Sequence, residues 1–242
     1  MTSKMNLVAL QFPTTTNFQI NLDKLIELIK ETNQNDIIVA PELCLNGYAY
    51  NRLDEAVTIT SKAIDELKNL SHNKTIISTF TTKFEDKYQN TLYMFSKGEI
   101  IHTQSKYKLF PLGDEEKYFE AGEKKDIKII ELHGVKIANL ICFELRFTEL
   151  WEQIKGADII CIPAMWGKTR KEHYEALTKA LAITNQSYVI ASDSSNNDMA
   201  SSSGIITPFG ETYQDDSKEL ISHPFDSFEI KKMRKYIKVG LS

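Results

Sequence analysis

The 242-residue sequence predicts an α/β domain built on mixed β-sheets. Short apolar runs rich in valine and isoleucine alternate along the chain with stretches whose apolar residues recur at helical spacing. Several of the short runs are apolar throughout, as strands are when both of their faces are buried. Some neighbouring runs are joined by tight turns, and such hairpins add antiparallel strands to a parallel sheet.

In the first half of the chain, we expect a strand over residues 4–12 and a helix over residues 21–30, where leucine and isoleucine recur every three or four residues. A second strand, residues 36–40, ends at Pro41, because proline has no N–H to donate to a neighbouring strand. This half is completed by a helix over 54–70, a strand over 75–80, and a hairpin over 90–103 that turns at 96–99.

In the second half, residues 127–132 and 135–142 are expected to form two strands on either side of His133-Gly134. A strand over residues 158–162 ends at Pro163. The other expected elements are helices over 147–155 and 171–186, a strand over 188–192, and a final hairpin of 203–207 with the segment after Gly210.

Composition excludes several classes of function. Lysine and arginine total 29 and aspartate and glutamate 33, so the formal charge is −4. Nucleic-acid-binding proteins normally carry a basic excess or patch, so no nucleic-acid partner is expected. No apolar run approaches the ~20 residues that span a bilayer, and therefore no membrane partner is expected. No linker or repeat divides the sequence, which predicts one domain over residues 1–242.

The cysteines and the N-terminus indicate a cytoplasmic protein. Cys44, Cys142 and Cys161 cannot all pair within one chain, and none lies in a CxxC motif. Free thiols in a reducing compartment are the simplest interpretation. Residues 1–6 lead directly into a strand-like run without the apolar segment and cleavage site of a secretory signal.

Three reactive residues follow expected strands. Glu42 follows strand 36–40 and Pro41, Cys142 ends strand 135–142, and Lys106 follows the hairpin. Sites in open α/β sheets form where strands end at their carboxyl edge. A thiolate can attack a carbonyl carbon, a carboxylate can take the thiol proton, and an ammonium can stabilise the oxyanion. Together they predict acyl transfer through a covalent intermediate.

Other polar and sulfur-containing residues have ordinary structural interpretations. Cys161 lies inside an apolar strand and is expected in the core, and Cys44 is also expected to be structural, although it lies two residues after Glu42. Lys108 is expected to matter less than Lys106. No metal and no cofactor are expected, because the sequence contains no HExxH, paired CxxC, Walker A or G-x-G-x-x-G pattern.

From the first strand to Pro208-Phe209-Gly210, the sequence resembles the nitrilase (carbon–nitrogen hydrolase) superfamily. The strings that carry the resemblance occur in the family's order: Pro41-Glu42-Leu43, Lys106-Tyr107-Lys108-Leu109-Phe110, Glu115 with Phe119 and Gly122, Ile141-Cys142-Phe143-Glu144-Leu145-Arg146-Phe147, Gly156-Ala157-Asp158, Pro163-Ala164-Met165-Trp166 and His173-Tyr174-Glu175.

The resemblance implies a fold and a role for each matching residue. It implies a four-layer α-β-β-α sandwich that forms a homodimer or a larger homo-oligomer. Glu42 matches the general base, Lys106 the catalytic lysine, and Cys142 the nucleophile. Glu115, rather than its neighbour Glu116, matches a second glutamate beside the site, and the backbone N–H of Phe143 is the expected second oxyanion donor.

The implied reaction is hydrolysis of a non-peptide C–N bond in a small amide through a cysteine acyl-enzyme. The strings around Lys106 and Cys142 look most like the ω-amidase-type branch, which acts on dicarboxylic acid monoamides. Such a substrate needs a cation in its pocket, for which Arg146 is one candidate. Arg146 is equally compatible with pinning the loop after Cys142, and Trp166 with a pocket wall, a core position or a dimer contact.

Several residues depart from the commonest family pattern, and other functions stay open at this level. Lys108 stands in place of histidine, Glu144 of aspartate, Thr148 of proline and Thr184 of glutamate. One alternative is a Cys-His hydrolase or acyltransferase that uses His133 or His173 as its base. The other is a non-catalytic binding protein on the same fold.

Overall fold

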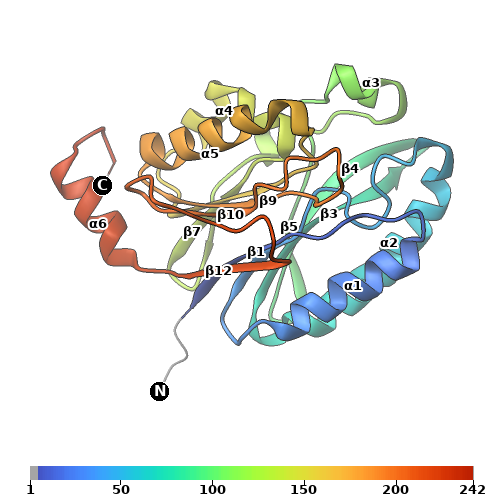
Figure 1. Cartoon of the computed structure of the whole chain (residues 1–242), viewed down its shortest axis with the longest axis horizontal. Coiled ribbons are helices and arrows are strands. Elements are labelled where there is room, and N and C mark those ends of the chain that lie inside the picture. The colour runs from blue at the N-terminus through green and yellow to red at the C-terminus, as the bar shows by residue number, and fades with distance from the viewer. Residues whose placement is uncertain (1–4, 242) are drawn as a thin grey trace.

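The computed structural model describes residues 5–241 as two six-stranded mixed sheets packed face to face, with helices on both outer faces. Helices α1 and α2 cover one sheet and α4 and α5 cover the other, so the layers run α-β-β-α (Figure 1). This arrangement confirms the expected fold class. No helix among residues 5–241 is long and apolar enough to cross a membrane.

The first sheet has the strand order β12-β1-β2-β3-β4-β5. Strands β1, β2 and β3 are parallel, and the other neighbours are antiparallel. Helix α1 begins at Phe18, three residues before the expected start at position 21, because the Asn17 side chain accepts hydrogen bonds from the N–H groups of Gln19 and Ile20. The elements of this half are β1 (Asn6–Leu10), α1 (Phe18–Glu31), β2 (Ile37–Val39), α2 (Leu53–Leu70), β3 (Thr75–Phe84), β4 (Lys87–Ser96), β5 (Glu99–Ser105) and β12 (Leu220–Pro224).

The second sheet has the order β11-β10-β9-β8-β7-β6, with β7, β8 and β9 parallel. Helix α5 packs over this sheet, and its C-cap residue Gln186 adopts a left-handed conformation. The elements of this half are α3 (Glu115–Tyr118), β6 (Ile130–Leu132), β7 (Val135–Asn139), α4 (Thr148–Gln153), β8 (Ile159–Pro163), α5 (Lys171–Asn185), β9 (Tyr188–Ser192), β10 (Gly204–Ile206), β11 (Thr212–Gln214) and α6 (Ser227–Tyr236).

The layering explains why the central strands are apolar on both faces. In β1, Leu7 and Ala9 pack in the cluster shared with the second sheet, whereas Val8 and Leu10 pack in the cluster shared with α1 and α2. Successive side chains of a strand point to opposite faces, so a strand between two apolar layers needs apolar residues at every position.

Several boundaries and three elements differ from the sequence prediction. Residue 4 of the first expected strand lies outside the described residues, and β3 continues four residues beyond position 80. Strand β7 ends at Asn139 rather than at Cys142, because Cys142 has φ +46° and begins a 3₁₀ helix, Cys142–Arg146. Elements α3, β12 and α6 were not predicted.

Weak hydrophobic patterning accounts for the missed C-terminal elements. Strand β12 lies at the edge of its sheet and buries only Ile221, so its sequence lacks a strand-like apolar run. Helix α6 buries only Ile230 and Met233. Arg234 of this helix is largely buried and bonds to Asp158 Oδ1 at 3.1 Å, whereas its neighbours Lys231, Lys232 and Lys235 are exposed.

Candidate functional site

The candidate site lies where the carboxyl ends of β2 and β7 meet the chain that follows β5. Glu42 follows β2, Cys142 follows β7, and Lys106 comes directly after β5. The two sheets are joined here, because the Glu42 N–H donates to the carbonyl oxygen of Ala164, which follows β8, at 3.0 Å. The fold therefore brings the three residues from distant parts of the sequence into one region.

Lys106 lies between two carboxylates. Its Nζ donates to Glu42 Oε1 at 2.8 Å, to Glu115 Oε1 at 2.6 Å and to the Tyr48 hydroxyl at 3.2 Å. Lys106 and Glu42 are fully buried and Glu115 is 2% exposed, whereas Glu116 is exposed. The structure thus brings Glu115, and not its neighbour, to the lysine.

The charges in this cluster are strongly coupled. Burial lowers the pKa of Lys106, but Glu42 and Glu115 outweigh burial and raise that pKa above its ordinary value. Burial raises the pKa of Glu115, with Lys106 opposing and Glu42 adding to the shift. Lys106 is therefore a permanent cation at neutral pH. Its donors are directed by neighbours that are themselves held in place.

Glu42 is held on both carboxylate oxygens. Asn90 Nδ2 donates to Oε1 at 2.8 Å, beside the lysine, and the Met165 N–H donates to Oε2 at 3.1 Å. Asn90 lies on β4 and Met165 follows β8, so the carboxylate is fixed by elements of both sheets. A fixed, buried carboxylate is suited to accept a proton from a group beside it.

Cys142 begins its 3₁₀ helix in the left-handed region, at φ +46°. This conformation is uncommon for a residue with a side chain, and such residues are enriched at functional sites as well as in turns. The side chain is 8% exposed and borders a cavity. Burial raises the pKa of the thiol well above its ordinary value, Glu42 raises it further, and Lys106 opposes both. The resting group is therefore a neutral thiol that needs a base.

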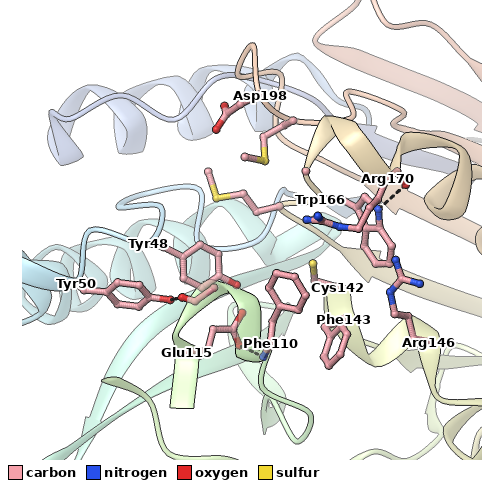
Figure 2. Close-up of a pocket in the computed structure, with 14 residues that line it drawn as sticks. Tyr48, Tyr50, Phe110, Glu115, Cys142, Phe143, Arg146, Trp166, Arg170 and Asp198 are labelled. Carbon is pink, nitrogen blue, oxygen red and sulfur yellow. Dashed lines mark hydrogen bonds between the residues drawn. The ribbon is translucent and has the colours of Figure 1, made fainter. Parts of the chain in front are cut away.

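The cavity has a volume of about 330 Å³, and five of its fourteen lining residues are aromatic (Figure 2). Phe143 packs its ring on Phe110 at a centroid distance of 5.0 Å, and Trp166 packs on Tyr174 at 5.2 Å. All of the predicted substrate-binding residues border the cavity together with other side chains; the lining comprises Tyr48, Tyr50, Phe110, Gly113, Glu115, Cys142, Phe143, Arg146, Met165, Trp166, Gly167, Arg170, Asp198 and Met199.

Neither histidine of the alternative mechanism borders this cavity. His133 lies in the turn before β7, and Cys142 follows the opposite end of that strand. His173 Nδ1 lies 3.2 Å from Arg146 Nη2. In residues 5–241, no group of three or more His, Cys, Asp or Glu side chains is arranged to hold a metal ion.

Sequence reasoning missed Tyr48, Asn90 and Arg170. Tyr48 and Asn90 contact Lys106 and Glu42 directly, and Arg170 borders the cavity. Asn90 lies in the predicted hairpin, where an asparagine is an ordinary residue and gives no indication of function. Arg170 lies in a polar stretch before helix α5 that resembles an ordinary exposed helix start.

Glu144 ties the lysine segment to the cysteine segment. This fully buried carboxylate accepts from the Tyr107 N–H at 2.6 Å and from the Ile141 N–H at 2.7 Å. These donors immediately follow Lys106 and immediately precede Cys142. The departure from aspartate noted in the sequence therefore occurs at a residue that sets the spacing of two candidate catalytic groups.

Replacement of Glu144 by glutamine is expected to weaken the pH dependence of stability. Burial raises the pKa of Glu144 to about 7, against the opposing N–H groups of Ile141 and Tyr107. A raised pKa in the folded state contributes stability that is complete below the ordinary value of 4.5 and is lost as pH rises through about 7. The free energy of unfolding is measured with denaturant at pH 5 and at pH 8. Between these two pH values it should fall by up to ~3 kcal/mol more in the wild type than in Glu144→Gln.

The exposed neighbour provides the control for this measurement. Glu149→Gln, whose carboxylate is half exposed, should keep the wild-type pH slope. Equal slopes in Glu144→Gln and the wild type would show that Glu144 does not titrate differently on folding.

Comparison with known proteins identifies the family of the chain. The profile of the carbon-nitrogen hydrolase family matches residues 7–234. The chain is 34% identical over 225 residues to a 2-oxoglutaramate amidase of Bacillus subtilis (strain 168), covering 87% of this chain and 85% of that protein. It is 28% identical over 217 residues to the omega-amidase YafV of Yersinia enterocolitica, covering 86% and 84%.

A solved structure shares the fold. Nit3 of Saccharomyces cerevisiae, a member of branch 10 of the nitrilase superfamily, superposes with a TM-score of 0.87 at 23% identity, covering 98% of this chain and 95% of that one. The family match spans nearly all of the sequence, and one relative exceeds 30% identity over most of both chains. The chain therefore belongs to the carbon–nitrogen hydrolase family.

Proposed function

We propose that this carbon–nitrogen hydrolase cleaves small amides through an acyl-enzyme on Cys142. The observation that carries the proposal is the fixed ammonium of Lys106, which is held between the carboxylates of Glu42 and Glu115 beside a neutral buried thiol. This arrangement supplies a nucleophile, a proton acceptor and an oxyanion stabiliser.

The first half of the reaction forms the acyl-enzyme. Glu42 takes the thiol proton as the Cys142 sulfur bonds to the amide carbon, and the carbonyl electron pair moves to oxygen. Lys106 Nζ and the Phe143 N–H stabilise the resulting oxyanion. Cleavage of the C–N bond then passes the proton from Glu42 to the leaving nitrogen, which departs as ammonia from a primary amide.

The second half releases the acid. Glu42 removes a proton from a water molecule as the water oxygen bonds to the thioester carbon. The C–S bond of the new tetrahedral intermediate breaks, the sulfur recovers the proton, and the carboxylic acid leaves. In both halves Glu115 holds Lys106 in position, because its Oε1 accepts a second hydrogen bond from the same ammonium at 2.6 Å.

We further propose that the substrate is a dicarboxylic acid monoamide. The cavity is at the small end of the range for ligand pockets, so it suits a short substrate. Arg146 and Arg170 both border it, and neither has a carboxylate partner within 4.0 Å among residues 5–241. The names of the 2-oxoglutaramate amidase and omega-amidase relatives indicate the same class of substrate.

Ammonia release from matched amides tests the substrate class. Glutaramate and pentanamide have the same chain length and differ in whether a carboxylate or a methyl group ends the chain. A charge-assisted hydrogen bond contributes ~1.5–3 kcal/mol, so kcat/KM should be at least ~10-fold higher for glutaramate. Equal values, or a preference for pentanamide or for N-carbamoyl compounds, would reject a dicarboxylic acid monoamide.

A further inference from the structure

We propose that Arg170, rather than Arg146, is the residue that binds the distal carboxylate of the substrate. The inference rests on the proposed function, because it assigns one part of the same cavity to the substrate's anionic end. It concerns a residue that lies outside every catalytic string of the sequence, four residues after Trp166.

The backbone of Arg170 is fixed against the cavity wall. Arg170 ends a 3₁₀ helix, Lys168–Arg170, that leads directly into α5. Its carbonyl oxygen accepts from Trp166 Nε1 at 2.8 Å, and its N–H donates to the Gly167 carbonyl oxygen at 2.9 Å. A side chain with a fixed base loses less conformational entropy when it binds a ligand.

The side chain of Arg170 extends across the cavity. Its guanidinium carbon lies 5.4 Å from the centre of the Phe110 ring, on the segment that carries Lys106 and Glu115. Figure 2 shows the guanidinium reaching from the Trp166 side into the space above Cys142. The group is thus positioned over the cavity rather than on its outer surface.

Gly167 makes room for this conformation. A Cβ atom at Gly167 would lie 2.7 Å from Arg170 Nη2, which is closer than real contacts allow. The absence of a side chain at position 167 therefore permits the inward position of the guanidinium. This dependence supplies a second way to disturb Arg170 without removing its charge.

Among the described residues, the guanidinium of Arg170 has no anionic partner. In residues 5–241 its side-chain hydrogen bond is a long one, from Nη1 to Thr169 Oγ1 at 3.4 Å, and no carboxylate lies within ion-pair distance. Burial, and then the charge of Arg170, lowers the pKa of Arg146, so the two cations repel each other. A bound carboxylate would relieve this repulsion and could accept two N–H bonds from the planar guanidinium.

Arg146 is engaged elsewhere. Its guanidinium carbon lies 4.8 Å from the centre of the Trp166 ring, and its Nη2 lies 3.2 Å from His173 Nδ1. In Figure 2 it lies along the Trp166 ring, while Arg170 extends toward Cys142. These contacts suit Arg146 to supporting the Trp166 wall and to adding positive potential.

Selectivity measurements test the assignment. For each variant, the ratio of kcat/KM for glutaramate to kcat/KM for pentanamide is compared with the wild-type ratio. Arg170→Gln should lower this ratio ~10- to 100-fold, mainly through a higher KM for glutaramate. Arg170→Lys should give an intermediate ratio because it keeps the charge and loses the planar fork. Gly167→Ala should also lower the ratio because it displaces the guanidinium.

Two further variants make the result specific. Lys168→Gln removes an exposed cation from the same 3₁₀ helix and should keep the wild-type ratio. Arg146→Gln should lower the ratio less than Arg170→Gln does. Thermal melting of each variant identifies any that fail to fold. If Arg170→Gln does not fold, Arg170→Lys and Gly167→Ala test the assignment in its place.

The outcomes separate this inference from the proposed function. A wild-type ratio near one would reject the substrate class, and with it a carboxylate-binding role for Arg170. A high wild-type ratio that persists in Arg170→Gln, or that is lost only in Arg146→Gln, would overturn the assignment to Arg170 and leave the amidase proposal intact.

Discussion

Cys142→Ser is expected to abolish amide turnover while the chain remains folded. Serine keeps the size and position of the side chain, so the 3₁₀ helix and the cavity wall should persist. A hydroxyl is far less acidic and less nucleophilic than a thiol, and no histidine borders the cavity to activate it. Loss of a nucleophile commonly costs ~10⁴-fold or more in kcat.

Ammonia release and intact-protein mass measurement check this prediction together. Wild-type protein mixed with a slow amide should gain the mass of one acyl group, and Cys142→Ser should gain none at the same time point. Cys44→Ala and Cys161→Ala are the matched controls, because both thiols are fully buried and neither borders the cavity. Those two variants should still acylate, although each is expected to lose stability by creating a small void.

Turnover by Cys142→Ser at near the wild-type rate would exclude the thiol mechanism. Acylation that disappears in Cys44→Ala but persists in Cys142→Ser would move the nucleophile to the neighbouring segment. Cys44 lies within the core cluster under α1 and α2, and burial raises its pKa to about 12. Its environment therefore favours an inert thiol.

The strands that are buried on both faces are the part of the fold that the sequence predicts best. Strands β2, β8 and β9 fall within a residue or so of their expected positions, because an unbroken apolar run has few other stable environments. Strand β12 and helix α6 were not predicted, because they lie at the periphery of the molecule and contribute little to its core. They bury one and two residues respectively, so their patterns resemble those of loops.

Some residues of the candidate site are indicated by local sequence patterns and others are not. Glu42, Lys106 and Cys142 are candidates that the sequence offers, because each stands at or after the end of an expected strand within a distinctive local string. Arg170 is not among them, because its position over the cavity depends on Gly167 and on a bond from the Trp166 indole, and neither contact is encoded in a local pattern. The left-handed backbone of Cys142 was also not predictable, since cysteine has no preference for that region.

Lys106→Met is expected to destabilise the protein as well as to abolish activity. The variant keeps a long apolar side chain but leaves the carboxylates of Glu42 and Glu115 buried with no cation between them. Removing one partner from a buried ion pair costs ~3–5 kcal/mol, because the remaining charge is uncompensated. The variant also lacks the oxyanion stabiliser, so kcat should fall at least ~100-fold even in the folded fraction.

The loss of stability should depend on pH in a defined direction. Lys106 lowers the pKa of Glu115, so its removal raises that pKa further above the ordinary value of 4.5. A group whose pKa is raised by folding stabilises the protein at pH values below its pKa in the unfolded state. This stability is lost as pH rises through its pKa in the folded state. Denaturant unfolding should therefore show a smaller difference between Lys106→Met and the wild type at pH 5 than at pH 8.

Two variants distinguish this electrostatic cause from a simple packing defect. Lys108→Met removes a partly exposed lysine two residues away and should change stability by less than ~1 kcal/mol. The double variant Lys106→Met, Glu115→Gln removes one of the two opposed carboxylates, so it should recover part of the lost stability without recovering activity. If the double variant is as unstable as Lys106→Met at pH 8, the uncompensated charge of Glu115 is not the cause. In that case Lys106 would stabilise the fold through its packing and its bond to Tyr48 instead.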